Sequence, residues 1–328
     1  MPDVIVVESV SRHYGRHAEV QALHDVSLRV AEGEVVALLG DNGAGKTTLS
    51  KIIATLLLPS SGLVSVAGHD IVRSPRAVRA VVSSVFGGER GLYGRLSGRH
   101  NLEFFAALKG IPHSRIEAAV DEVLATTGLR DAADRAVRSY SRGMKQRLHL
   151  AVSSLTRPRV LLLDEPTIGL DPSEADRLRG AVASLRESGV AILLTSHQLL
   201  DVERLADRVV LLSQGQIRSD TDLETFRRSA GYTAVATVYG SGTPPRAQEA
   251  AQQLGSAEVR VEPEGWTLSL RVRRWDTTTF RRLAAILDAA GEGREVHSID
   301  VAPLRLEDVY SSIGGPQKSV NANVHHAR

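Results

Sequence analysis

The chain has 328 residues, 42% of them hydrophobic, with 40 basic and 38 acidic side chains and no cysteine. This length suffices for about two domains of ~100–200 residues each, and the near-neutral charge leaves no basic patch, so we expect no nucleic-acid partner. Without cysteine the chain has neither disulfides nor thiolate metal sites, and we find no apolar run of the ~20 residues that span a bilayer and no signal-peptide leader.

The first predicted elements are strands. Residues 4–10 and 22–30 are rich in strand-forming residues, and Val35–Leu39 is a continuous apolar run. A short apolar run of this kind is typical of a strand buried in a parallel sheet. It ends at Gly40, and a helix-like run begins at Lys46, so the intervening segment joins a buried strand to a helix.

That segment reads GDNGAGKTT over residues 40–48 and matches the pattern G-x-x-x-x-G-K-[ST]. Its glycines let backbone N–H groups cradle phosphate oxygens at a helix N-terminus, where the helix dipole also favours negative charge. Lys46 would reach the terminal phosphates of a nucleotide and Thr47 would offer its hydroxyl to Mg²⁺. A chance glycine-rich turn is the alternative, and the flanking elements argue against it. The residues assigned to nucleotide binding are Gly40, Asn42, Gly43, Gly45, Lys46, Thr47 and Thr48.

Residues 98–128 change to helical periodicity. Ser114 and Glu117 form a capping-box pattern that predicts the start of a helix, and Gly128 predicts its end. We expect an apolar core from one face of this helix, formed by Ile116, Val120, Val123 and Leu124.

A second buried strand, residues 160–163, is followed directly by Asp164 and Glu165. Ligands of open α/β sheets bind at the carboxyl ends of the strands, which is where these two carboxylates should lie. Asp164 can complete a Mg²⁺ shell through water, because this ion takes few carboxylates and keeps several waters. Glu165 is then left to act on the attacking water as the catalytic base. An Asp-Glu pair alone would suggest an exposed strand end, but beside a phosphate loop it indicates hydrolysis of a nucleoside triphosphate.

Later strands at 190–194 and 209–212 alternate with helical stretches, as a mainly parallel sheet demands. Residues 229–314 carry a different pattern of alternating strands and amphipathic helices, which suggests a small α+β unit with the order β-α-β-β-α-β. The final segment, 315–328, is polar and expected to be disordered, so its two adjacent histidines indicate a tail rather than a metal site.

The chain resembles the nucleotide-binding subunit of an ATP-binding cassette (ABC) transporter over about residues 4–225. Tyr14 resembles the aromatic that stacks on adenine, and Ser141 with Gly143 lies in YSRGMKQR, which is similar to the family signature. Asp171 closes a segment like the dimer-contacting loop, and His197 resembles the switch histidine that assists catalysis. Each residue alone has an ordinary explanation, a turn tyrosine or a strand-end histidine, but their order along the chain is specific.

This resemblance implies an α/β P-loop NTPase cassette over residues 1–228, with a mainly parallel sheet core, an antiparallel β subdomain and a helical subdomain at about 89–158. It also implies a head-to-tail homodimer that closes over two ATP molecules with Mg²⁺, each site combining one chain's phosphate loop with the other chain's signature. A separate transmembrane permease would dock near Tyr93, Phe104 and Phe105. The accessory domain, 229–314, resembles that of drug-export subunits.

Two segments depart from the family pattern. Arg142 replaces the first glycine of the signature, and Met144 replaces its glutamine. The family also places a Mg²⁺-contacting glutamine where this chain has Gly88. The adjacent Glu89 is a tentative replacement as metal ligand, and an exposed loop charge is an equal alternative.

The sequence therefore predicts an ATPase on the cytoplasmic face of the membrane that drives export of a drug, antibiotic, lipid or polymer. The ATPase of an importer would share the catalytic residues, and only the signature variant and the C-terminal domain argue against it. Soluble cassettes that act on ribosomes or DNA are a third class. They typically carry two cassettes or zinc-binding cysteines, whereas this chain has one cassette and no cysteine.

Overall fold

The computed structural model describes residues 2–15, 19–86, 91–196, 198–229, 231–288 and 293–312. The chain divides into two units, Met1–Leu223 and Glu224–Arg328. The division falls within helix α8 (Leu223–Arg228), a few residues before the boundary at 228 suggested by the sequence.

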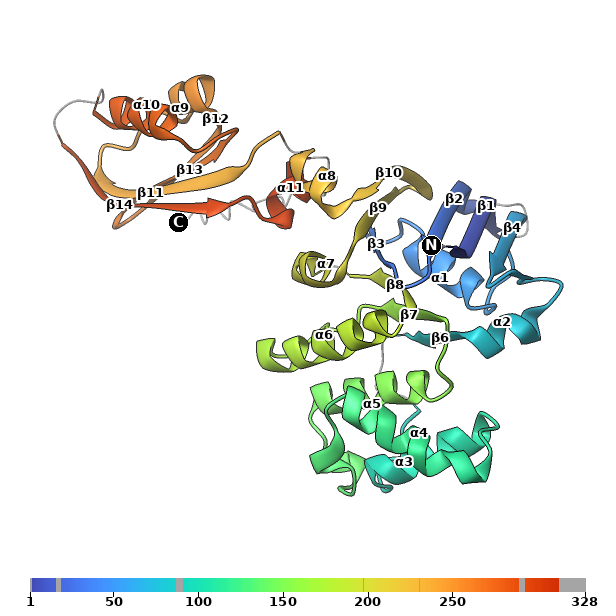
Figure 1. Cartoon of the computed structure of the whole chain (residues 1–328). Helices are drawn as coiled ribbons and strands as arrows, with labels where there is room; N and C mark the ends of the chain where they lie inside the picture. Colours follow the sequence, from blue (N-terminus) through green and yellow to red (C-terminus); the bar gives the residue numbers. More distant parts are fainter. Residues whose placement is uncertain are drawn as a thin grey trace, which may run out of the picture. The chain divides into compact units, whose positions relative to one another are not determined.

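The centre of the first unit is a six-stranded sheet with the order β10-β9-β3-β8-β7-β6 (Figure 1). All its pairings are parallel except that of β9 with β10. Strands that are covered on both faces read as continuous apolar runs, and all five residues of β3 are buried. The strands are β3 (Val35–Leu39), β6 (Val82–Val85), β7 (Val160–Asp164), β8 (Ala191–Thr195), β9 (Arg208–Ser213) and β10 (Gln216–Asp222).

A second sheet of four antiparallel strands, with the order β2-β1-β4-β5, shares its hydrophobic core with helix α1 (Lys46–Ile53) and the central sheet. Its strands are β1 (Asp3–Tyr14), β2 (Val20–Ala31), β4 (Ser61–Val66) and β5 (His69–Asp70). This arrangement confirms the antiparallel subdomain expected beside a parallel core. Other helices of the first unit include α2 (Pro75–Val81), α6 (Pro172–Glu187) and α7 (Leu199–Leu205).

Helices α3 (Gly98–Leu108), α4 (His113–Thr126) and α5 (Arg142–Ser154) form a group with its own apolar core (Figure 1). Short 3₁₀ turns at Arg130–Ala132 and Val137–Ser139 connect α4 to α5. The apolar face predicted for α4 is confirmed, since Val120, Val123 and Leu124 are buried in this core.

The predicted capping box at the start of α4 is wrong. The helix begins at His113, two residues before the start that an N-cap at Ser114 implies, and Pro112 occupies the N-cap position without a side-chain hydrogen bond. Ser114 therefore lies inside the first turn, where its side chain has no capping role. The fixed φ of proline is compatible with the residue that precedes a helix, and Pro112 has a φ of −56° there.

The second unit is a four-stranded antiparallel sheet with the order β12-β13-β11-β14, and α9 and α10 lie together along it in Figure 1. In chain order its elements run β-α-β-β-α-β, followed by a last helix. This order and strand arrangement are those of a ferredoxin-like fold. The elements are β11 (Ala234–Gly242), α9 (Ala247–Leu254), β12 (Gly255–Glu262), β13 (Gly265–Val272), α10 (Thr277–Asp288), β14 (Arg294–Pro303) and α11 (Leu306–Ser312).

Strand β13 shows why this unit has a core of its own. Its apolar residues alternate with polar ones, and alternate side chains of a strand point to opposite faces of the sheet. The apolar set packs against α9 and α10 through Ala250, Leu283 and Ile286. The apolar residues of β13 are Trp266, Leu268, Leu270 and Val272. The C-terminal segment 315–328 lies outside the described residues.

Candidate nucleotide-binding site

The loop between β3 and α1 takes a backbone path that only glycine accommodates at several positions. Gly40, Gly43 and Gly45 have φ values of +149°, +83° and +109°, in the region that side chains rarely adopt. A Cβ at Gly40 would overlap the carbonyl oxygen of Leu212, and one at Gly45 would come within 2.5 Å of the carbonyl oxygen of Ala22. The glycine spacing of the motif is therefore required by the way this loop packs on its neighbours.

Lys46 closes the loop from inside. Its side chain is buried, and its Nζ donates hydrogen bonds to the carbonyl oxygens of Gly40 at 2.6 Å and Asp41 at 3.0 Å. Burial lowers the pKa of Lys46, and the negative charges of Glu165, Asp164 and Asp41 oppose that shift. The phosphate loop and the acidic end of β7 thus act on the same lysine.

At that strand end, Asp164 accepts a hydrogen bond from the hydroxyl of Thr195, its direct neighbour at the end of β8. The next residue, Glu165, donates its backbone N–H to the carbonyl oxygen of Thr195 at 3.0 Å. Glu165 also has a φ of +51°, a conformation that is unfavourable for a non-glycine residue and that often marks functional sites. Thr195 was not predicted as a site residue, although its place directly after an apolar strand run was a usable signal.

A second group of predicted residues lies at the N-termini of α5 and α6. Ser141 caps α5 by accepting the backbone N–H of Met144 at 3.1 Å. Gly143 packs so closely on α6 that a Cβ there would overlap the side chain of Glu174. Asp171 caps α6, and the hydrogen bond from the backbone N–H of Glu174, followed by that from the Ser173 hydroxyl, lowers its pKa.

Arg142, which departs from the family signature, packs against a glycine of the loop before α6. The guanidinium of Arg142 lies beside Gly169, where an added Cβ would overlap it, and Gly169 has a φ of +69°. The signature residue that is unusual in this chain therefore packs on the loop that ends at Asp171.

A buried ion pair that the sequence did not reveal joins α5 to α6. Arg147 lies 3.0 Å from Glu174 through Nη2 and Oε2, and both side chains are almost fully buried. Its Nη1 donates to the carbonyl oxygens of Thr127 and Gly128 at 3.0 and 2.9 Å. One guanidinium thus connects the α4–α5 segment to the helix that Asp171 begins.

Tyr14 ends β1 and is 38% exposed, with the guanidinium of Arg12 4.8 Å from its ring centroid. A partly exposed ring with a cation over one face is available for stacking. His197, Gly88 and Glu89 lie outside the described residues.

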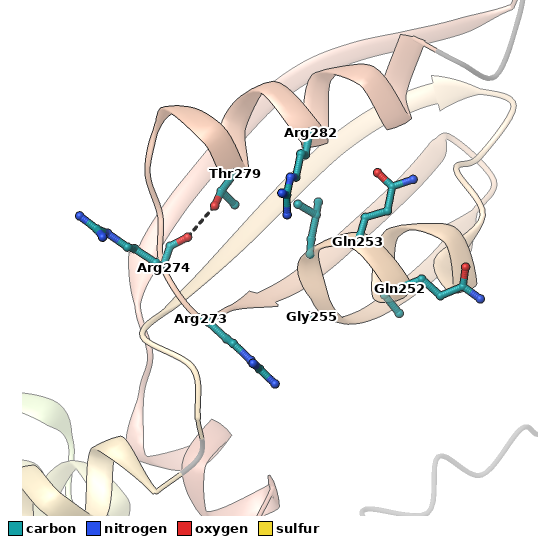
Figure 2. A pocket seen from close by; sticks show the side chains of 9 residues that line it. Gln252, Gln253, Gly255, Arg273, Arg274, Thr279 and Arg282 are labelled. Carbon is teal, nitrogen blue, oxygen red and sulfur yellow. Dashed lines mark hydrogen bonds between the residues drawn. The ribbon is translucent and has the colours of Figure 1, made fainter.

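The second unit contains a hollow that is separate from these residues (Figure 2). It lies between the end of α9 and the first half of α10, and Arg273, Arg274 and Arg282 are among its lining residues. In Figure 2 the hydroxyl of Thr279 donates to the carbonyl oxygen of Arg274, at 2.8 Å. None of the residues predicted to bind nucleotide lines this hollow.

Among the residues that the structure describes, no helix is long and apolar enough to cross a membrane.

Comparisons with known proteins agree with this geometry. Residues 23–168 match the family model described as ABC transporter. The daunorubicin resistance ATP-binding protein DrrA3 of Streptomyces coeruleorubidus is 35% identical over 320 residues, which cover 96% of this chain and 97% of that relative.

Two solved structures share the fold of the cassette. One is cbiO1 from Clostridium perfringens, described as part of an ABC transporter complex, with 28% identity, a TM-score of 0.63, and coverage of 69% of this chain and 91% of that chain. The other is a dimeric ATP-binding cassette with ADP and Pi, with 23% identity, a TM-score of 0.59, and coverage of 67% and 98%, so it shows the fold alone. The full-length match to DrrA3 and the matching family model show that the chain belongs to the ATP-binding proteins of ABC transporters and is an ATPase.

Proposed function

We propose that the chain is the ATP-hydrolysing subunit of a membrane exporter, working as a homodimer on the cytoplasmic face with a separate permease. The observation that carries the ATP-hydrolysing part of this proposal is the strand pairing. Strands β3 and β7 both pair in parallel with β8, so the phosphate loop after β3 and Asp164–Glu165 at the end of β7 lie at the same edge of the sheet. The name of the relative DrrA3, a daunorubicin resistance ATP-binding protein, supports export of a drug-like substrate.

The residues fit a magnesium–nucleotide complex. Thr47 offers a hydroxyl, and Asp164 a carboxylate whose Oδ1 is already oriented by Thr195, and oxygen atoms are the ligands that Mg²⁺ prefers. When bound, Mg²⁺ neutralises charge on the phosphate oxygens. Lys46 binds the terminal phosphates, and Glu165 orients the attacking water and accepts its proton.

The second group of residues would complete the site of a partner subunit. Ser141 and the N–H groups around Gly143 begin α5, and the positive end of a helix dipole favours phosphate. In a head-to-tail dimer this end would face the γ-phosphate of ATP held by the partner, and Asp171 would contact the partner nearby. A single chain then carries half of each site.

An aromatic patch supports the docking of a permease. The rings of Tyr93 and Phe104 lie 4.9 Å apart and those of Phe104 and Phe105 lie 5.3 Å apart, both edge to face. Tyr93 and Phe104 are each more than 40% exposed, and Asn101 fixes the loop by accepting the backbone N–H of Tyr93 at 2.8 Å. Exposed aromatic rings on a rigid support are typical of interface anchors.

Two substitutions test the chemistry. Glu165→Gln keeps the size of the side chain and removes its charge, so we expect kcat for Mg-ATP to fall by ~10²–10⁴-fold while ATP still binds. Lys46→Ala should instead abolish ATP binding itself, because its ammonium is the buried cation of the phosphate loop. Hydrolysis at the wild-type rate by Glu165→Gln would show that another group is the base.

Export is tested with the permease that co-purifies with this chain. The pair is reconstituted in vesicles, and ATP-driven movement of an anthracycline out of the nucleotide-exposed side is followed by fluorescence. Transport that requires ATP and fails with Glu165→Gln supports an exporter. Movement in the opposite direction would favour the importer reading.

A further inference from the structure

A fully buried carboxylate, Asp201 in α7, is absent from the catalytic scheme above. Its Oδ1 accepts a hydrogen bond from Nε of Arg179 in α6 at 2.8 Å, and Nη2 of the same guanidinium lies 2.7 Å from this oxygen as an ion pair. Arg179 is itself almost fully buried. A buried charge must be paired and hydrogen-bonded to be tolerated, and this guanidinium satisfies only one of the two carboxylate oxygens.

The second carboxylate oxygen, Oδ2, contacts the loops that follow β7 and β8. Asp201 Oδ2 accepts hydrogen bonds from the hydroxyls of Thr167 and Ser196, the latter at 3.0 Å, and both residues are buried. Thr167 follows Glu165 by two residues, and Ser196 directly precedes His197. One buried carboxylate therefore connects the segment that carries the base to the segment that carries the switch histidine.

Gln198, on the far side of His197, joins the same network. Its backbone N–H donates to the hydroxyl of Ser196 at 3.0 Å, and its side-chain Oε1 lies 3.1 Å from the hydroxyl of Thr167. Both residues that flank His197 are thus connected to Thr167. Because a buried polar network is costly to break at any member, these segments should move as a unit.

We propose that Asp201 is a positioning residue, which keeps the loop after Glu165 and the segments flanking His197 in a fixed relation during hydrolysis. It touches no substrate. This inference rests on the proposed ATPase function and adds to it a group that joins the loop after Glu165 to the residues on either side of His197. If Asp201 only stabilised the fold, its ion pair with Arg179 would suffice. Instead, Oδ2 of Asp201 accepts hydrogen bonds from Thr167 and Ser196, which lie in two different loops.

Thr167→Val in the full-length chain is the decisive variant. It removes the hydroxyl that contacts Asp201 and leaves the Arg179–Asp201 ion pair in place, with little change in side-chain volume. Small misplacements of catalytic groups typically cost up to about 10²-fold in rate, so we expect kcat to fall by about ten- to a hundredfold. The dissociation constant for Mg-ATP, measured by equilibrium binding, should not change, because the phosphate loop is untouched.

A matched control comes from the same arginine. Asp176 accepts from Arg179 Nη1 at 2.8 Å but is mostly exposed, so Asp176→Asn should leave kcat unchanged. A double-mutant cycle then tests whether the contact acts through one network. Thr167→Val combined with Asp201→Asn should be no slower than Asp201→Asn alone, since non-additive effects mark residues that act together.

The outcomes separate the two claims. An unchanged kcat of Thr167→Val, or a loss of ATP binding in step with kcat, would overturn the positioning role. If Asp201→Asn does not fold, Thr167→Val decides alone, because its ion pair is intact. A wild-type chain without ATPase activity would instead contradict the proposed function.

Discussion

At the scale of single residues, the site depends on positions with an unusual backbone conformation, in which φ is positive. Gly45 lies against the carbonyl oxygen of Ala22 and the side chain of Leu23, and Glu165 holds a left-handed conformation while its N–H bonds to Thr195. Such conformations persist only where surrounding contacts over-determine them. For Gly45 these contacts come from β2, and for Glu165 the contact comes from the end of β8.

Gly45 and Gly43 provide a matched pair for this point. Both have positive φ, so alanine should cost about 1–2 kcal/mol in backbone strain at either position. Only Gly45 is also crowded, since a Cβ at Gly43 meets no atom within 4 Å. In urea unfolding without nucleotide, Gly45→Ala should lose more stability than Gly43→Ala. Equal losses would mean that the crowding at Gly45 relaxes without cost.

At the scale of elements, helix starts are set by specific capping groups. Ser97 begins α3 by accepting the backbone N–H of His100 at 3.1 Å, and Asp171 begins α6 by accepting two backbone N–H groups. Helix α4 has no such side chain, and proline fixes its entry instead. Local sequence patterns predict the helices themselves better than their first residues.

The two serines test this assignment. Ser97→Ala removes a true cap and should lower the free energy of unfolding by ~1 kcal/mol. Ser114→Ala should change it by less than about 0.5 kcal/mol, because Ser114 lies exposed inside a first turn. The measurement is urea denaturation of both variants beside the wild type. A large loss of unfolding free energy in Ser114→Ala would show that Ser114 is a helix cap after all.

The cap at Asp171 predicts how the stability of the fold depends on pH. Hydrogen bonds to the ionised carboxylate lower its pKa in the folded state, below the ~3.9 of an unperturbed aspartate. Its contribution to stability is therefore complete above the unfolded value and is lost as the pH falls through the folded value. The stability difference between the wild type and Asp171→Asn should thus shrink on acidification below about pH 4. A difference that widens there would contradict the assigned cap.

At the scale of the whole molecule, the chain is two units with separate cores. All residues assigned to the phosphate site belong to the first unit. The second unit carries a ferredoxin-like fold and no residue assigned to nucleotide chemistry, so we propose that it stabilises the dimer or its assembly with the permease. A two-fold axis would bring like surfaces of two copies together.

Chains ending at Leu223 and at Arg228 test this role. Both should bind ATP like the full chain, because the phosphate loop and the acidic strand end are retained. Both should dimerise or co-purify with the permease more weakly, which molecular mass in solution and pull-down measure. Assembly equal to that of the full chain would leave the second unit without this role, and lost ATP binding would place it in the nucleotide site.

The sequence by itself determined the cassette, the phosphate loop and the acidic strand end, because each depends on local patterns: a buried apolar run, glycine spacing and residues at a strand's end. The β-α-β-β-α-β order of the second unit was likewise visible in alternating residues. These patterns involve residues that are close in the sequence, so they can be recognised without knowledge of the fold.

Only the tertiary structure decided which distant groups meet. The bond between Thr195 and Asp164 follows from the pairing of β7 with β8, and the Arg147–Glu174 pair from the packing of α5 on α6. The Asp201 network joins Thr167, Arg179 and the stretch 196–201, which lie far apart in the chain. A buried charge is stabilised by partners that can be far away in the sequence, so these partners are identified only once the chain is folded.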